Sequence, residues 1–375
     1  APELTLLQIM SASSVLRAME VGVMREQAAA MSPGERRTLA EHLTGQSLDA
    51  STARAPAPAC TGTAAEFDYS EQPGAEGWGA TADNRRYFGS EVTSLTAADL
   101  PKLELKWAFA FPEAIRARSQ PVAAGGALFV GSQNGTVYAL DRESGCIRWT
   151  FSTVAEVRTG IVAAPWKGKD DTPMLFFGDI VGNVYAVNAV TGELAWRDRP
   201  DDHPSLTLTA APAYHDGKLL VPLSSLEVTA AADPEYACCT FRGGVAAYDA
   251  RSGEKLWTGY TIDEQPRVVG KNDIGTNRIA PSGAPIWGTP SVDAKRNVMY
   301  VGTGENYSSP ANDTSDAILA LSLEDGRIVW SQQMTAGDAW NMGCETKERI
   351  NCPPEDGPDY DFGAATIIAT TSAGK

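Results

Sequence analysis

Most of the chain alternates apolar with polar positions over short stretches, a pattern that predicts β-strands. Ala127-Leu-Phe-Val-Gly131 and Met299-Tyr-Val-Gly302 are examples. In the first part of the chain, apolar residues recur instead at helical intervals. Ser32-Pro-Gly-Glu35 there has the form of a helix-capping box, and Thr44-Gly45 has the form of a helix end. We therefore predict a helical segment at residues 1–45, a linker rich in Ala, Ser and Pro at 46–65, and an all-β domain at 66–375.

One phrase recurs four times in the β region. Each copy has an Asp or Asn, then a Gly, and a Trp four residues after the Gly: Asp141, Gly145 and Trp149; Asn188, Gly192 and Trp196; Asp249, Gly253 and Trp257; Asp325, Gly326 and Trp330. Each copy follows an alternating apolar run, so the repeating unit is a small sheet whose last strand carries Trp. A flat indole at one place in every unit lets neighbouring units stack, which predicts the blades of a β-propeller.

The repeats are interrupted by insertions at residues 226–240, 263–285 and 308–314. Insertions into a repeat array map to loops on one face, which is where we expect the functional site. The chain stops soon after Phe362-Gly-Ala-Ala-Thr-Ile-Ile, which resembles the first strand of another blade. We therefore expect the chain to be part of a longer protein with an incomplete ring of blades.

Composition narrows the class of protein. The net charge of −16 and the lack of basic clusters argue against nucleic acid as a partner, and no apolar run is long enough to predict a membrane span. The six cysteines contain no Cys-x-x-Cys pair and the three histidines are too few for a zinc site. Cys238 and Cys239 are adjacent, and Cys344 and Cys352 share one short segment, which favours disulfides and a periplasmic or secreted protein.

Several residues depart from the repeat. Thr209, Ser224 and Glu227 are separated by fifteen and then three residues, and Trp287 lies outside the Gly-to-Trp frame. With these residues, the chain from about Trp78 onward resembles the alcohol dehydrogenases that depend on pyrroloquinoline quinone (PQQ). Within them it is most similar to the polyvinyl alcohol dehydrogenase group. The resemblance implies a PQQ-type β-propeller, eight-bladed in the family.

The same resemblance implies a set of residues that bind PQQ. A planar tricarboxylate quinone needs an aromatic face and a rim of hydrogen-bond donors. Trp287 matches the family's Trp beneath the cofactor, and Arg158 falls where the family has an Arg that reaches the quinone carboxylates. The family's remaining ligands correspond to Thr209, Ser224 and Glu227.

A calcium ion, or a lanthanide, is also implied. Glu227 corresponds to a family metal ligand, and Glu305 and Asn306 both lie where the family offers an Asn, so both are candidates. Asp359 and Asp361 match an Asp-x-Asp segment in which the first Asp is the catalytic base and the second binds the metal in members that use lanthanides. These are our catalytic candidates, and Asp338 is a rival base.

The helical segment resembles the end of a c-type cytochrome domain. Met24, in Gly22-Val-Met24, occupies the position of the family's axial haem ligand. The sequence contains no Cys-x-x-Cys-His, so haem c is expected only if a longer chain supplies that motif. The resemblance implies oxidation of an alcohol substrate, such as secondary alcohols of a polymer, with cytochrome c as electron acceptor. The alternative is a non-catalytic propeller of PQQ type that serves as a protein-binding scaffold.

Overall fold

The computed structural model of the chain describes residues 7–8, 10–21, 24–48, 57–75, 77–90 and 93–371. Gly22, Val23 and residues 49–56 of the predicted linker lie outside the described residues, and nothing tests the predicted domain boundaries. The chain forms two compact units. The first comprises the described residues of Gln8–Asp179 and Tyr185–Arg197, and the second those of Ile180–Val184 and Asp198–Lys375, with Leu7.

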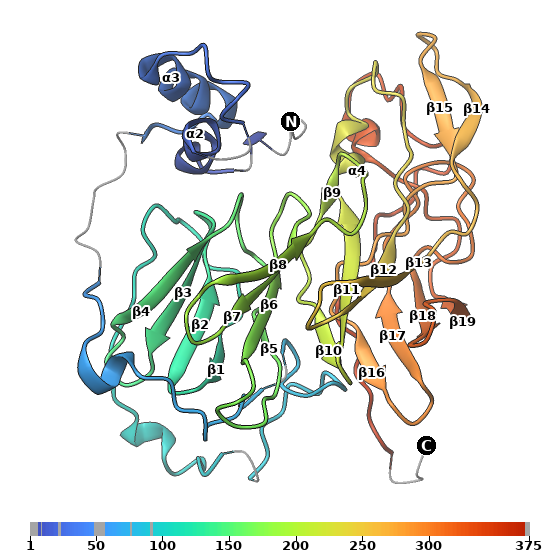
Figure 1. The fold of residues 1–375 in the computed structure, drawn as a ribbon. Helices are drawn as coiled ribbons and strands as arrows, with labels where there is room; N and C mark the ends of the chain where they lie inside the picture. Colours follow the sequence, from blue (N-terminus) through green and yellow to red (C-terminus); the bar gives the residue numbers. More distant parts are fainter. Residues whose placement is uncertain are drawn as a thin grey trace. The chain divides into compact units, whose positions relative to one another are not determined.

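Two four-stranded sheets, in green in Figure 1, lie wholly or mostly in the first unit, each with its strands in chain order. One sheet contains β1 (Val122–Ala124), β2 (Ala127–Gly131), β3 (Thr136–Asp141) and β4 (Ile147–Ser152). The other contains β5 (Val162–Ala163), β6 (Met174–Gly178), β7 (Val184–Asn188) and β8 (Leu194–Asp198). Their inward side chains, including Phe129, Leu175 and Phe177, form one apolar core.

The second unit repeats the pattern twice. One sheet contains β10 (Ala213–His215), β11 (Lys218–Ser225), β12 (Gly244–Asp249) and β13 (Lys255–Tyr260), with β9 (Leu206–Thr207) also paired to β11. The next contains β16 (Ser291–Asp293), β17 (Val298–Gly302), β18 (Ala317–Ser322) and β19 (Ile328–Gln333). The insertion between them forms the hairpin of β14 (Arg267–Lys271) and β15 (Asn277–Ala280), and α4 (Glu227–Ala230) and the 3₁₀ turn η4 (Met342–Glu345) lie in the other loops.

The recurring Trp lies in the last strand of each sheet, namely β4, β8, β13 and β19. Trp149 packs against Gly192 of the next phrase, where an added Cβ would lie 2.7 Å from the indole. Gly192 also has a φ of 74°, a backbone conformation that favours glycine. Gly326 packs against Trp257 in the same way. The predicted all-β fold built from blades is therefore confirmed, and the phrase is explained by the contact between Trp and Gly.

Two helices of the first unit account for the helical pattern. They are α2 (Ala12–Glu20) and α3 (Pro33–Thr44); the latter begins at the predicted capping box and ends at Gly45, which has the left-handed backbone. Arg17 of α2 donates hydrogen bonds to the backbone carbonyls of Asn134, between β2 and β3, and of Thr153, just after β4. Two short 3₁₀ turns, η2 (Gly62–Ala65) and η3 (Leu100–Lys102), follow. The resemblance of this segment to a cytochrome domain stays a prediction.

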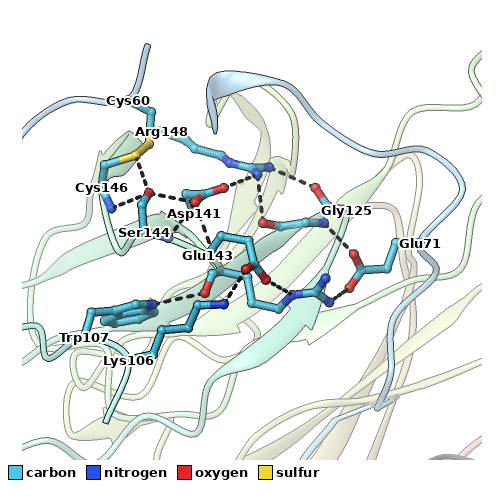
Figure 2. A network of polar contacts seen from close by, with 12 residues as sticks. Cys60, Glu71, Lys106, Trp107, Gly125, Asp141, Glu143, Ser144, Cys146 and Arg148 are labelled. Atoms are coloured by element: carbon cyan, nitrogen blue, oxygen red, sulfur yellow. Dashed lines mark hydrogen bonds and ion pairs between the residues drawn. A yellow bond between two sulfur atoms is a disulfide. The ribbon is translucent and has the colours of Figure 1, made fainter. Parts of the chain in front are cut away.

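A closed network of polar contacts, which we call the Asp141 network, surrounds the turn between β3 and β4 (Figure 2). The Asp141 carboxylate accepts hydrogen bonds from Arg148 (2.8 Å) and from the hydroxyl of Ser144 (2.7 Å). Arg148 in turn donates to the carbonyls of Gly125 and Gly126. The charge of the buried Asp141 carboxylate is therefore compensated by its neighbours.

The Cys60–Cys146 disulfide lies beside the Asp141 network and closes a sequence separation of 86 residues. Around it, Ile147 donates to the carbonyl of Pro58 (3.0 Å) and Cys60 donates to the carbonyl of Ile147 (2.9 Å), so residues 58–60 run along the outer edge of β4. The other disulfides are Cys238–Cys239 and Cys344–Cys352, as expected from the cysteine content. None of the helices in the described ranges is long and apolar enough to cross a bilayer.

Candidate active site

Five acidic side chains gather in the second unit where β17 leaves its sheet; we call them the acid cluster. They are Glu305, Asp316, Asp338, Asp359 and Asp361. The segment that contains Asp361 runs along the end of β17, because the amide of Phe362 donates to the carbonyl of Thr303 (3.0 Å). The amide of Glu305 donates to the Asp361 carboxylate (3.2 Å), and an added Cβ at Gly304 would collide with that carboxylate. Gly304 is thus the residue that lets the two segments meet.

Three members of the cluster have carboxylate oxygens that all lie within 4.8 Å of one another: Glu305, Asp359 and Asp361. Glu305 is buried, Asp361 is half-buried and Asp359 is exposed. Burial and the neighbouring carboxylate of Asp361 raise the pKa of Glu305 well above its ordinary value. Burial, followed by the charges of Asp361 and Asp338, raises the pKa of Asp359 to about 6. The group most accessible to a substrate therefore has a pKa suited to accepting a proton near neutral pH.

Asp316 and Asp338 are fully buried beside these three groups. Asp338 accepts hydrogen bonds from the amides of Asp359 (3.4 Å) and Tyr360 (3.3 Å). Both carboxylate oxygens of Asp316, in contrast, are buried and lack a hydrogen-bond partner. Burial, with the charges of Asp338 and Asp361, raises the pKa of Asp316 to about 7.

No described Lys or Arg forms an ion pair with any member of the acid cluster. Carboxylates packed without cations repel one another and favour binding of a hard, oxygen-seeking metal ion. The donor set therefore fits a calcium-like cation. A second group, made of Cys344, Cys352 and Asp356, is not comparable, because its two sulfurs form a disulfide.

Glu227 lies in the same unit but outside the three-carboxylate group. Its buried carboxylate accepts hydrogen bonds from the amides of Thr240 (2.8 Å) and Phe241 (2.7 Å) and from the hydroxyl of Tyr236 (3.0 Å). Burial acts to raise the pKa of Glu227, but the hydrogen bond and charge of His203 and these amides outweigh it, so the pKa is lowered. Glu227 is therefore a carboxylate whose oxygens already have partners in this structure.

Asn306 is also buried and already hydrogen-bonded. Its amide nitrogen donates to the carbonyl of Ser282 (2.9 Å), and its carbonyl oxygen accepts from the amide of Asn312 (2.8 Å). Glu305 therefore belongs to the acid cluster, and the proposed metal role of Asn306 stays a prediction.

The predicted cofactor residues of the second unit connect to this region. The hydroxyls of Thr209 and Ser224 are 3.2 Å apart. Next to Ser224, the carbonyl of Leu223 accepts a hydrogen bond from Ile286, the residue before Trp287. The indole of Trp287 is 41% exposed and packs against Gly363, two residues after Asp361. An exposed indole fits the flat face of a planar ligand such as PQQ, and a pair of hydroxyls fits its polar rim.

Arg158 lies in the first unit. Burial and the charges of Arg118 and Arg116 lower its pKa, while the charge of Glu156 acts in the other direction. Glu156 is buried and pairs with Arg116 (2.9 Å). Arg158 is therefore part of an arginine-rich site that is suited to an anion.

Asp316 is the member of the cluster that the sequence prediction missed. The signal for it is register: β18 pairs antiparallel with β17, with Ile318 opposite Gly302, so residue 316 falls opposite residue 304. The register predicts Asp316 as a member of the cluster only when the contact between Gly304-Glu305 and the segment around Asp361 is already known.

Comparison with known proteins defines the class. Residues 76–350 match the family described as "PQQ: Glucose/ethanol/alcohol dehydrogenase, beta-propeller domain". The chain belongs to this family, and the predicted resemblance is confirmed.

Two relatives give a closer description. The chain is similar to the polyvinylalcohol dehydrogenase of Pseudomonas sp., with 34% identity over 381 residues, 97% of this chain and 58% of that protein. It is also similar to the polyvinylalcohol dehydrogenase of Sphingopyxis sp. strain 113P3, with 37% identity over 344 residues, 91% of this chain and 51% of that protein. The chain thus spans little more than half the length of these relatives.

Solved structures support the fold. The quinohemoprotein alcohol dehydrogenase from Comamonas testosteroni aligns with a TM-score of 0.57 and 24% identity, over 80% of this chain and 45% of that one. A europium-containing methanol dehydrogenase aligns with a TM-score of 0.53 and 22% identity, over 72% and 50% of the two chains.

Proposed function

We propose that this chain is part of a PQQ-dependent alcohol dehydrogenase that oxidises alcohol groups, with secondary alcohols of a polymer such as polyvinyl alcohol as the first substrates to test. The observation that carries the proposal is the acid cluster, which lacks basic partners and adjoins the exposed indole of Trp287. A protein-binding scaffold has no need of such a cluster. The names of the relatives support the choice of alcohol oxidation and of the polymer.

In this proposal, the residues have separate tasks. Trp287 supplies the face on which the quinone stacks, and the hydroxyls of Thr209 and Ser224 orient its rim. Glu305 and Asp361 hold a calcium or lanthanide ion. A bound PQQ would supply the acceptor for the hydride of the carbinol carbon, and a bound cation would supply a Lewis acid.

Asp359 is the proposed catalytic base. It is the exposed carboxylate of the three, and its pKa of about 6 leaves it ionised at neutral pH but still basic enough to accept the hydroxyl proton. Asp338 is buried, and two backbone amides donate to it, so it is better suited to holding the backbone at Asp359 than to meeting a substrate.

Cytochrome c is the proposed electron acceptor, and the cofactor role of Arg158 stays a prediction from the family resemblance. We also propose a periplasmic or secreted location, which the three disulfides support because such bonds persist in oxidising compartments.

The test uses the full-length protein supplied with PQQ and Ca²⁺. We expect quinone absorbance to appear with the protein and a redox dye to be reduced when an alcohol is added. Asp359→Asn should lower the turnover number about 10²- to 10⁴-fold without loss of quinone binding. Asp313→Asn, an exposed acid upstream of β18, is the matched control and should leave both readouts unchanged. Absence of quinone binding in the unmodified protein would refute the proposal.

A further inference from the structure

None of the roles proposed above involves Asp316, yet its carboxylate has an unusual environment. The residue is fully buried, and neither carboxylate oxygen has a hydrogen-bond partner. An unpaired buried carboxylate costs several kcal/mol in its charged form, because water no longer solvates it. Most buried polar groups in proteins have partners, so an orphaned one indicates an ion or ligand that would complete it.

The backbone places Asp316 next to the proposed metal ligands, although its carboxylate lies outside the group of three within 4.8 Å. The amide of Asp316 donates to the carbonyl of Gly304 (3.1 Å), which places the residue next to Glu305. The backbone amide of Asp361 approaches the Asp316 carboxylate without completing a hydrogen bond. Asp338, the other fully buried member of the acid cluster, differs because two backbone amides donate to its carboxylate. Both carboxylate oxygens of Asp316 therefore remain able to bind an ion.

We propose that Asp316 is a ligand of the cation held by Glu305 and Asp361, an inference that rests on the proposed function and extends it. Calcium-like ions take six to eight oxygen ligands, and their affinity rises with the number of charged ones. With Asp316 as a third carboxylate ligand, the site does not need Asp359, which stays free to accept the substrate proton. The proposed ligands Glu305, Asp316 and Asp361 are then less exposed than Asp359, which meets the alcohol.

The experiment measures Ca²⁺ binding to the full chain by isothermal titration calorimetry, in the absence of PQQ and alcohol. Asp316→Asn keeps the shape of the side chain and removes its charge, and we expect the dissociation constant for Ca²⁺ to rise at least about 10-fold. Asp313→Asn should bind Ca²⁺ like the unmodified chain. Asp316→Gly is a second variant, because the φ of 47° at this position suits glycine, and it should show the same loss. Thermal unfolding without Ca²⁺ verifies that each variant is folded.

The possible results separate this inference from the proposed function. If Glu305→Gln loses Ca²⁺ binding while both Asp316 variants retain it, Asp316 is not a ligand and the proposed metal site survives. If the unmodified chain binds no Ca²⁺, the site and the inference both fail. If both Asp316 variants and Glu305→Gln weaken binding while Asp313→Asn does not, Asp316 belongs to the site.

Discussion

Asp141 ends β3 and Asp316 directly precedes β18; both acids are buried, at 5% and 0% exposure, and their surroundings are opposite. Asp141 lies in a closed network in which Arg148 and Ser144 bind its carboxylate. The carboxylate oxygens of Asp316 have no hydrogen-bond partner, and the charges that act on this group come from other acids. Burial is the largest influence on both groups, yet the pKa of Asp141 is lowered and that of Asp316 is raised to about 7.

The difference shows that burial alone does not distinguish a structural acid from a functional one. A buried carboxylate whose oxygens all accept hydrogen bonds from groups of its own chain stabilises the fold. A buried carboxylate without hydrogen-bond partners destabilises the chain when no ligand is bound, and a bound cation stabilises it most. A buried carboxylate with a raised pKa and no hydrogen-bond partner therefore indicates a functional site.

The largest effect is expected at Glu305. Glu305→Gln replaces a carboxylate ligand by an amide, so the affinity for Ca²⁺ should fall at least about 100-fold in calorimetry. The thermal midpoint without Ca²⁺ should stay the same or rise, because one of several repelling acids has been removed. An affinity that does not change would remove Glu305 from the metal site.

Asp141→Asn should lower stability and leave Ca²⁺ binding intact, the opposite of Glu305→Gln. We expect the free energy of unfolding to fall by about 1.5–3 kcal/mol in urea titrations, because the variant loses charged hydrogen bonds and leaves Arg148 unpaired. Ca²⁺ affinity should not change. Asp249→Asn is the matched control, because Asp249 binds Ser252 at the equivalent turn but is only half-buried, so its loss should be smaller.

The pH dependence of the Asp141 contribution follows from its lowered pKa. A carboxyl whose folded pKa is depressed stabilises the protein fully above its ordinary value of 3.8, and the stabilisation is lost as the pH falls through the folded pKa. The difference in unfolding free energy between the unmodified chain and Asp141→Asn should therefore be constant near neutral pH and shrink in acid. A difference that grows below the ordinary pKa would contradict this assignment.

The smallest effect is expected at the exposed rim of the Asp141 network. Lys106 and Glu143 pair there, with side chains 58% and 67% exposed (Figure 2). Water and salt screen such a pair, so Glu143→Gln should leave the unfolding transition unchanged within the error of a urea titration. A clear loss would mean that the network extends to its surface members.

The fold was predictable from the sequence because its determinants are local. The Gly and Trp of each phrase are separated by four residues, and each phrase is repeated, so the blade is visible without coordinates. The Asp141 network is local in the same sense, since Ser144 and Arg148 lie within seven residues of Asp141.

The site was less predictable because it joins distant segments. Glu305 and Asn306 are adjacent, and only the backbone shows which one faces Asp361. Glu227 has the spacing of a metal ligand, but the amides of Thr240 and Phe241 come from a loop whose path no local pattern reveals. Asp316 carries no motif at all, and its position depends on strand register.

The path of residues 58–60 has a consequence for behaviour in solution. The outer strand of a blade presents unpaired amides and carbonyls, which can template intermolecular sheet growth. Here Pro58 and Cys60 exchange hydrogen bonds with Ile147, and the Cys60–Cys146 bond fastens this cover to β4. Reduction of that bond would free the edge of the first blade, so a reducing environment should promote self-association before it unfolds the sheets.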